Sequence, residues 1–118
     1  MEEIVKKSDV KITIGLNEEN MPVQIMWEAT DNPSHVKPAD CKGMLLSLFD
    51  REHMDTLKID LWTKDMQISE MDRFFYQTFR AMADTYYRAT KNGDLANDMQ
   101  RFTQYFGEKT EVIPKSEK

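Results

Sequence analysis

Cysteine is almost absent from this sequence, which has one among 118 residues. A single thiol cannot form an internal disulfide, so the small secreted scaffolds that disulfides hold together are excluded. Long apolar runs are absent too, and none approaches the roughly 18 residues of a membrane-spanning helix. The first residues are charged and lack the apolar core of a secretory signal. We therefore expect a cytoplasmic protein with no membrane span.

Basic charge is also scarce, with 16 lysines and arginines against 21 acidic residues and a formal net charge of −5. Nucleic-acid binding depends largely on basic side chains that neutralise phosphates, so we expect no nucleic-acid partner. The four glycines are isolated and form no phosphate-binding loop, and we expect no cofactor. The length fits one domain with a core of its own.

Apolar residues alternate with polar ones in the first half of the chain, a period that is typical of β-strands. The alternation covers residues 10–16 and 23–29, joined by a polar turn, and predicts an antiparallel hairpin. Residues 44–49 and 57–61 predict a second hairpin. Between the hairpins, residues 31–40 contain two prolines and predict a loop, with at most one helical turn near residues 39–42.

After residue 65 the apolar spacing changes to three and four residues, which indicates helices. Ser69 predicts the start of a long helix, and Asn92 with Gly93 predicts its left-handed end. Asp94 predicts the cap of a second helix that ends near Gly107. The two apolar stripes are Met71, Phe74, Phe75, Thr78, Phe79, Met82 and Tyr86 on the first helix and Leu95, Met99, Phe102 and Phe106 on the second.

This order of elements predicts an α+β fold, a four-stranded antiparallel sheet followed by two C-terminal helices packed on one face. We expect a single domain over residues 1–118, with a core of about residues 9–107 and a flexible tail of about residues 108–118.

Some large apolar side chains fall on the strand parity opposite to Leu57, Ile59 and Leu61. A second apolar sheet face on a soluble chain usually meets another protein. We therefore predict an interface there and a homodimer, since two-fold contacts are the commonest. The candidate interface residues are Trp62, Met26, Leu45 and Phe49.

The residues with metal-binding or nucleophilic chemistry are few: Cys41, His35 and His53. A zinc site needs three or four converging ligands, usually with pairs two to five residues apart. Here the spacings are six and twelve residues, so we expect no metal site. A Cys–His nucleophile pair is conceivable on residue types alone, but nothing around Cys41 resembles a nucleophile turn.

Carboxylates offer the remaining catalytic candidates, Asp60 on a strand and Asp84 on the first helix. Asp60 lies between Lys58 and Trp62 on one face and could serve as a general acid. A strand carboxylate is more often a cross-strand partner on the solvated face. We therefore expect no catalytic residue and no enzyme.

One segment, Thr56-Leu57-Lys58-Ile59-Asp60-Leu61-Trp62-Thr63-Lys64-Asp65-Met66, is distinctive. With residues 16–18, 22–27, 82–85, 89–90 and 96–99 it resembles the gliding motility-associated family of the GldC type, found in Bacteroidetes. The resemblance covers about residues 9–107. It implies an accessory protein of the gliding or type IX secretion apparatus, with protein partners from that apparatus and no catalytic residues to transfer.

Three functions follow as hypotheses. The first is an interaction protein that self-associates and docks on motility or secretion components. The second is a polypeptide-binding chaperone, since strands followed by two helices in an acidic chain are similar in outline to SecB. The third is an enzyme with Asp60 or Asp84 as its acid. Exposed apolar area separates the first two, because a chaperone must keep it uncovered.

Overall fold

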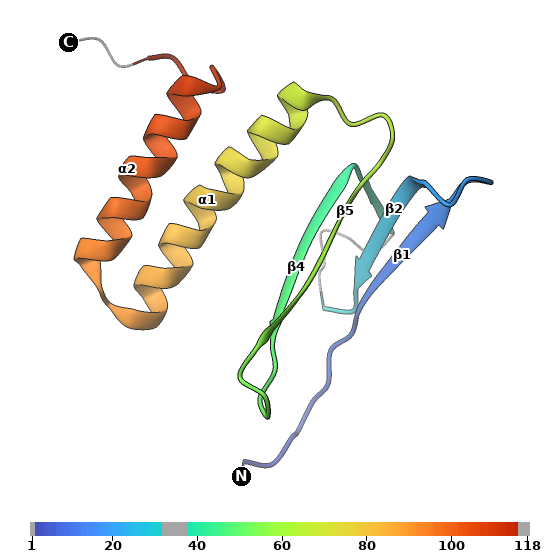
Figure 1. Ribbon diagram of the computed structural model, residues 1–118. Coiled ribbons are helices and arrows are strands. Elements are labelled where there is room, and N and C mark those ends of the chain that lie inside the picture. Colours follow the sequence, from blue (N-terminus) through green and yellow to red (C-terminus); the bar gives the residue numbers. More distant parts are fainter. Residues whose placement is uncertain (1, 32–37, 116–118) are drawn as a thin grey trace. The chain divides into compact units, whose positions relative to one another are not determined.

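The computed structural model describes residues 2–31 and 38–115. The chain divides into two compact units: Met1–Met66, the strand unit, and Gln67–Lys118, the helical unit. The described strands lie in the first and both helices in the second (Figure 1). The predicted α+β class with two C-terminal helices is confirmed. The packing of the helices on a sheet face stays a prediction.

The strand unit begins with the predicted hairpin, which is confirmed. Strand β1 (Val10–Leu16) pairs antiparallel with β2 (Pro22–Ala29). Their register places Ile14 opposite Ile25, and Ile25 is fully buried. The alternating pattern therefore gives this sheet one apolar face, as its period of two requires.

A short strand follows where the sequence predicts a loop or a helical turn. Strand β3 (Ala39–Cys41) pairs antiparallel with the other edge of β2, opposite Ile25–Trp27. The predicted helical turn is wrong, because backbone bonding to β2 holds these residues extended and three residues are too few to show a period. Residues 32–37 of the predicted loop, among them His35, lie outside the described residues.

The second predicted hairpin is also confirmed, as β4 (Gly43–Phe49) and β5 (Thr56–Trp62). The prediction of one four-stranded sheet is wrong, since the described strands form a three-stranded sheet, β1-β2-β3, and a two-stranded sheet, β4-β5. The cause is a bend at Lys42, which divides one extended run between two partners. The Thr63 amide donates to the Lys42 carbonyl, at 2.8 Å, beside this bend.

In the helical unit, α1 (Ile68–Thr90) begins one residue before Ser69, the predicted cap, and its observed cap lies two residues before Ser69. The cap is Gln67, whose backbone amide donates to the Glu70 carboxylate at 2.9 Å. This spacing of three residues is that of a capping box, and it satisfies an amide that the helix leaves without a partner.

The turn between the helices also differs from its prediction. Lys91 ends α1 in the left-handed conformation, with a φ of 60°. Helix α2 (Gly93–Lys109) begins two residues later, and its cap is Asn92 instead of Asp94. The Asn92 side chain accepts a hydrogen bond from the Leu95 amide at 3.1 Å. Asn92 is therefore used to start the second helix and not to end the first.

Small residues bring the two helices together. Ala83 of α1 and Ala96, Thr103 and Gly107 of α2 are buried. Beside them the Phe79 ring meets the Phe106 ring edge to face, with centroids 5.2 Å apart. Helix α2 extends to Lys109, into the segment expected to be a tail, and residues 116–118 of that segment lie outside the described residues.

Candidate functional site

The β4–β5 hairpin has one face made only of aliphatic and methionine side chains. Cross-strand pairs bring these together as Met44–Leu61, Leu46–Ile59 and Leu48–Leu57, a set called here the aliphatic ladder. Leu57 and Leu48 are 58% and 51% exposed, respectively. A two-stranded hairpin is marginal by itself in water, so an open apolar face of this kind calls for a cover.

The opposite side of the hairpin, called here the Trp62 face, carries three of the four candidate interface residues. Trp62 lies opposite Gly43, Leu45 opposite Asp60, and Phe49 opposite Thr56. Trp62 is 53% exposed. Glycine has no side chain, so nothing directly across the strand pair covers the Trp62 ring.

The fourth candidate, Met26, lies elsewhere. It belongs to the three-stranded sheet, where its cross-strand neighbours are Thr13 and Asp40. The structure thus brings Trp62, Leu45 and Phe49 to one face and does not place Met26 on that hairpin. Met26 and the other three residues belong to different sheets, and strand parity alone does not predict which sheet a residue joins.

Charged residues divide the Trp62 face. The Lys58 ammonium lies 2.8 Å from the Asp60 carboxylate, and the two side chains are 63% and 40% exposed, respectively. The pair stands between Phe49 at one end and Trp62 with Leu45 at the other. An exposed ion pair of this kind contributes little to stability. The structural interpretation expects a partner across the strand pair, but Lys58 belongs to the same strand as Asp60, and the residue opposite Asp60 is Leu45.

Asp84, the other carboxylate considered for catalysis, is also paired. Its carboxylate accepts a hydrogen bond from the Arg88 guanidinium at 3.0 Å, one helical turn later and in solvent. Such a pair is an ordinary feature of an exposed helix face.

The thiol and imidazole groups lie apart. Cys41 is half-buried, and its sulfur donates weakly to the Ile25 carbonyl at 3.5 Å. Burial, and then the nearby Asp40 charge, raise the pKa of this thiol, which makes the nucleophilic thiolate scarcer. His53 lies in the β4–β5 turn beside Asp50. Across residues 2–31 and 38–115, no group of three or more potential ligands is arranged to hold a metal ion.

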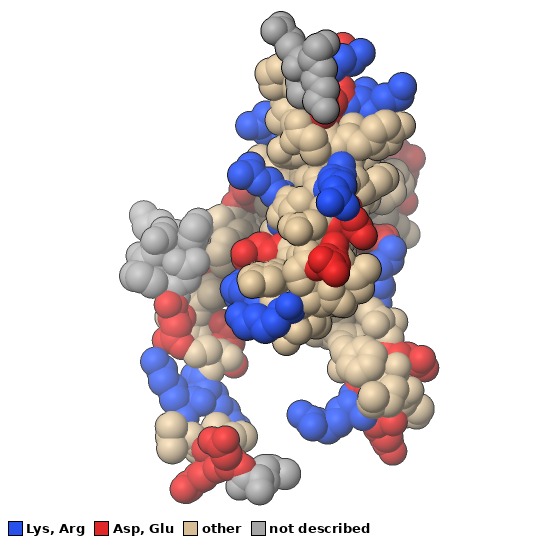
Figure 2. Space-filling model, turned by 90° about the vertical axis from the view of Figure 1, so that its left-hand side faces the viewer, with Lys and Arg blue, Asp and Glu red and all other residues tan. Residues whose placement is uncertain are grey.

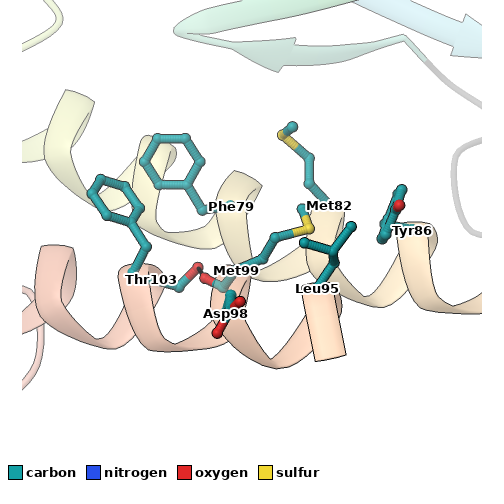
Figure 3. Close-up of a pocket in the computed structure, with 8 residues that line it drawn as sticks. Phe79, Met82, Tyr86, Leu95, Asp98, Met99 and Thr103 are labelled. Atoms are coloured by element: carbon teal, nitrogen blue, oxygen red, sulfur yellow. Dashed lines mark hydrogen bonds between the residues drawn. The ribbon is translucent and has the colours of Figure 1, made fainter. Parts of the chain in front are cut away.

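The helical unit contains an apolar groove of about 440 Å³ between α1 and α2. It is lined by Phe79, Met82, Tyr86, Leu95, Asp98, Met99, Phe102 and Thr103 (Figure 3). Met82 and Phe102 are each about half exposed. Figure 3 shows the Asp98 carboxylate directed away from Met99, and Asp98 pairs with Arg101 on the outer surface. The predicted stripes therefore supply the groove, although their periodicity did not reveal that it stays open.

A family model described as gliding motility-associated protein GldC-like matches residues 22–112. The chain belongs to this family. The GldC-like match begins at the first residue of β2 and ends after α2, so it covers part of each unit and leaves β1 before it. No curated protein and no solved structure matches the chain.

The net charge of this GldC-like chain is concentrated in its strand unit. Residues 1–66 contain 13 acidic and 8 basic residues, whereas residues 67–118 contain 8 of each. On the surface shown in Figure 2, acidic and basic side chains are interspersed. Neither described helix is long and apolar enough to cross a membrane.

Proposed function

We propose that this chain is a non-catalytic interaction protein of the gliding apparatus, linked to type IX secretion, and that it docks on a protein component through the Trp62 face. Membership of the GldC-like family supports the association with gliding motility. The observation that carries the docking role is the pair Trp62 and Leu45, neighbours on one hairpin face and both exposed. Tryptophan is enriched among residues that dominate binding energy.

The chemistry of the face defines the partner. Trp62 and Leu45 need an apolar side chain or pocket to cover them. The Lys58–Asp60 pair beside them carries both signs of charge, so a matching partner presents both signs at its rim. Rim charges of this kind orient a complex more than they tighten it.

The substitution Trp62→Lys tests the proposal, with Thr56→Lys as a matched control on the same strand and face. Both variants add one positive charge at an exposed position. In the native bacterium, Trp62→Lys is expected to abolish gliding and the crosslink to an apparatus component that the wild type forms, while Thr56→Lys retains both. Equal gliding and equal crosslinking by Trp62→Lys and wild type would exclude this face.

A second candidate function, a chaperone for unfolded polypeptides, is favoured by the aliphatic ladder. An extended apolar segment fits a flat strand surface, and Leu57 and Leu48 offer one in the strand unit. The chaperone proposal predicts that the protein slows aggregation of a permanently unfolded polypeptide. Leu57→Asn is expected to weaken that effect with folding retained. A wild-type protein without any effect at several-fold molar excess would remove this candidate.

A further inference from the structure

Strand β1 has an open edge. Among the described residues it pairs with β2 alone, and Figure 1 shows it at the border of its sheet. It is seven residues long and contains no proline. Natural proteins usually shorten, bend or cover such an edge, because its free backbone groups are a template for another strand.

The register identifies which backbone groups face outward. The Thr30 amide donates to the Asp9 carbonyl at 3.0 Å, so Asp9 points toward β2. Backbone direction alternates along an antiparallel strand, which turns Lys11, Thr13 and Gly15 inward as well. The outward amides and carbonyls therefore belong to the four aliphatic residues Val10, Ile12, Ile14 and Leu16.

We propose that β1 pairs antiparallel with β1 of a second copy of this chain, about a two-fold axis at Thr13. This register sets Ile12 opposite Ile14 of the second copy and Val10 opposite Leu16 of the second copy. Each pair consists of residues whose backbone groups face outward, so each exchanges two hydrogen bonds and the strands share about eight. The three-stranded sheet then continues from one copy into the other.

The strand is self-complementary in this register, which is why a second copy fits. Read from either end, Val-Lys-Ile-Thr-Ile-Gly-Leu sets aliphatic against aliphatic and threonine against threonine. Val10 is 70% exposed and Leu16 is 53% exposed, and each gains an apolar neighbour. Lys11 lies opposite Gly15 of the second copy. An axis at Lys11 would set the two lysines opposite each other, an unfavourable arrangement.

This pairing moves the dimer contact away from Trp62, where the sequence predicts it. The Lys58–Asp60 pair interrupts the apolar surface of the Trp62 face. The outward backbone groups of β1 belong to four aliphatic residues, and the register of β1 with β2 shifts only between Gly15 and Leu16. The inference goes beyond the proposed function, since it gives each assembly two copies of the docking face. Two linked sites bind a repeated partner with higher avidity than one.

The substitution Ile12→Pro tests whether the outward edge of β1 forms the dimer contact. Ile12→Pro removes an outward amide and leaves the β1–β2 bonds in place, since Ile12 does not donate to β2. Light scattering at tens of micromolar is expected to show a dimer for the wild type, for the control Ile12→Val and for Trp62→Lys, but a monomer for Ile12→Pro. A monomeric wild type, or a folded Ile12→Pro that stays dimeric, would overturn the proposal.

A disulfide crosslink tests the register of the proposed β1–β1 pairing. It also tests the pairing itself if Ile12→Pro fails to fold. In a Cys41→Ala background, Thr13→Cys places two thiols directly opposite each other, with Cα atoms about 4.5 Å apart. Mild oxidation is expected to give a covalent dimer with Thr13→Cys and none with the control Lys11→Cys. The reverse result, or no crosslink from Thr13→Cys, would overturn the proposal. Gliding plays no part in these measurements, so failure of the Trp62 docking proposal would be seen separately.

Discussion

Gly107 is a buried residue of α2 whose surroundings leave no room for a side chain. A Cβ atom built there would lie 2.6 Å from Cε1 of Tyr76 and 2.8 Å from Cγ1 of Ile113. Neither distance is compatible with a carbon–carbon contact. Glycine is therefore required inside α2, even though it weakens a helix by about 1 kcal/mol relative to alanine.

The substitution Gly107→Ala is accordingly expected to destabilise the protein by about 1–3 kcal/mol, because overpacking outweighs the gain in helix propensity. Gly93→Ala is the matched control, since its new Cβ would meet only Cε1 of Tyr87, at 3.8 Å. Its stability is expected to stay within about 0.5 kcal/mol of wild type. Urea unfolding of both variants measures the difference, and equal midpoints would contradict the packing argument.

The stability that the Asp50 carboxylate contributes depends on pH. This carboxylate accepts hydrogen bonds from the His53 amide at 2.6 Å and from the His53 ring, and these lower the pKa of Asp50. A carboxyl whose pKa is lower in the folded state contributes stability above its unfolded pKa of about 3.9 and loses it as pH falls through the folded value.

The melting temperature of Asp50→Asn is therefore expected to lie below that of wild type at pH 6, and the gap is expected to close at pH 2–3. Glu52→Gln, in the same exposed turn, serves as the control for loss of one negative charge. A constant gap across this pH range would show that the amide replaces the carboxylate poorly for a reason other than charge.

At the scale of elements, both hairpins and both helices follow from the periodicity of the sequence. The sequence contains no signal for β3. Its three residues are held by backbone hydrogen bonds to β2, and they show no alternation of apolar and polar residues. The positions of the helix caps differ from their prediction for a related reason. Ser69 and Asp94 are good caps by residue type, but Gln67 and Asn92 are the residues at which the backbone is still non-helical.

The candidate site was predictable in part. Strand parity correctly groups Trp62, Leu45 and Phe49, since β4 and β5 are neighbours in both sequence and space. Strand parity misplaces Met26, because the bend at Lys42 separates the sheet that contains Met26 from the β4–β5 hairpin. The groove between the helices depends on how the apolar stripes of α1 and α2 pack against each other. The periodicity of either helix alone does not predict that packing.

The segment after α2 is more than a loose end. The Ile113 amide donates to the Gly107 carbonyl at 3.2 Å, and the Ile113 side chain is half-buried. Truncation after Lys109 is therefore expected to lower the melting temperature by several degrees, through loss of an apolar contact of about 1 kcal/mol. Truncation after Lys115 is the control and is expected to leave the melting temperature unchanged. A melting temperature that is equal for both truncations would mean that residues 110–115 contribute nothing.

At the scale of the whole molecule, the uneven charge predicts how salt affects assembly. Residues 1–66 carry the entire net charge of −5, so pairing through β1 brings two negative strand units together. Salt screens that repulsion, and the dimer is expected to tighten several-fold between 20 and 300 mM NaCl. Analytical ultracentrifugation measures the dissociation constant. Weaker association at high salt would indicate an interface held by opposite charges.

The pairing of each element with its neighbour along the chain has a consequence for how the protein is made. β1 meets β2, β2 meets β3, β4 meets β5 and α1 meets α2, each across a short connection. Chains dominated by such local contacts fold rapidly, because little loop entropy is lost before a contact forms. The first hairpin can therefore close while the ribosome is still adding later residues, and the bond from the Lys64 amide to the Pro22 carbonyl follows once β5 has emerged. This order of contacts lets folding follow synthesis, from β1 to the last turn of α2.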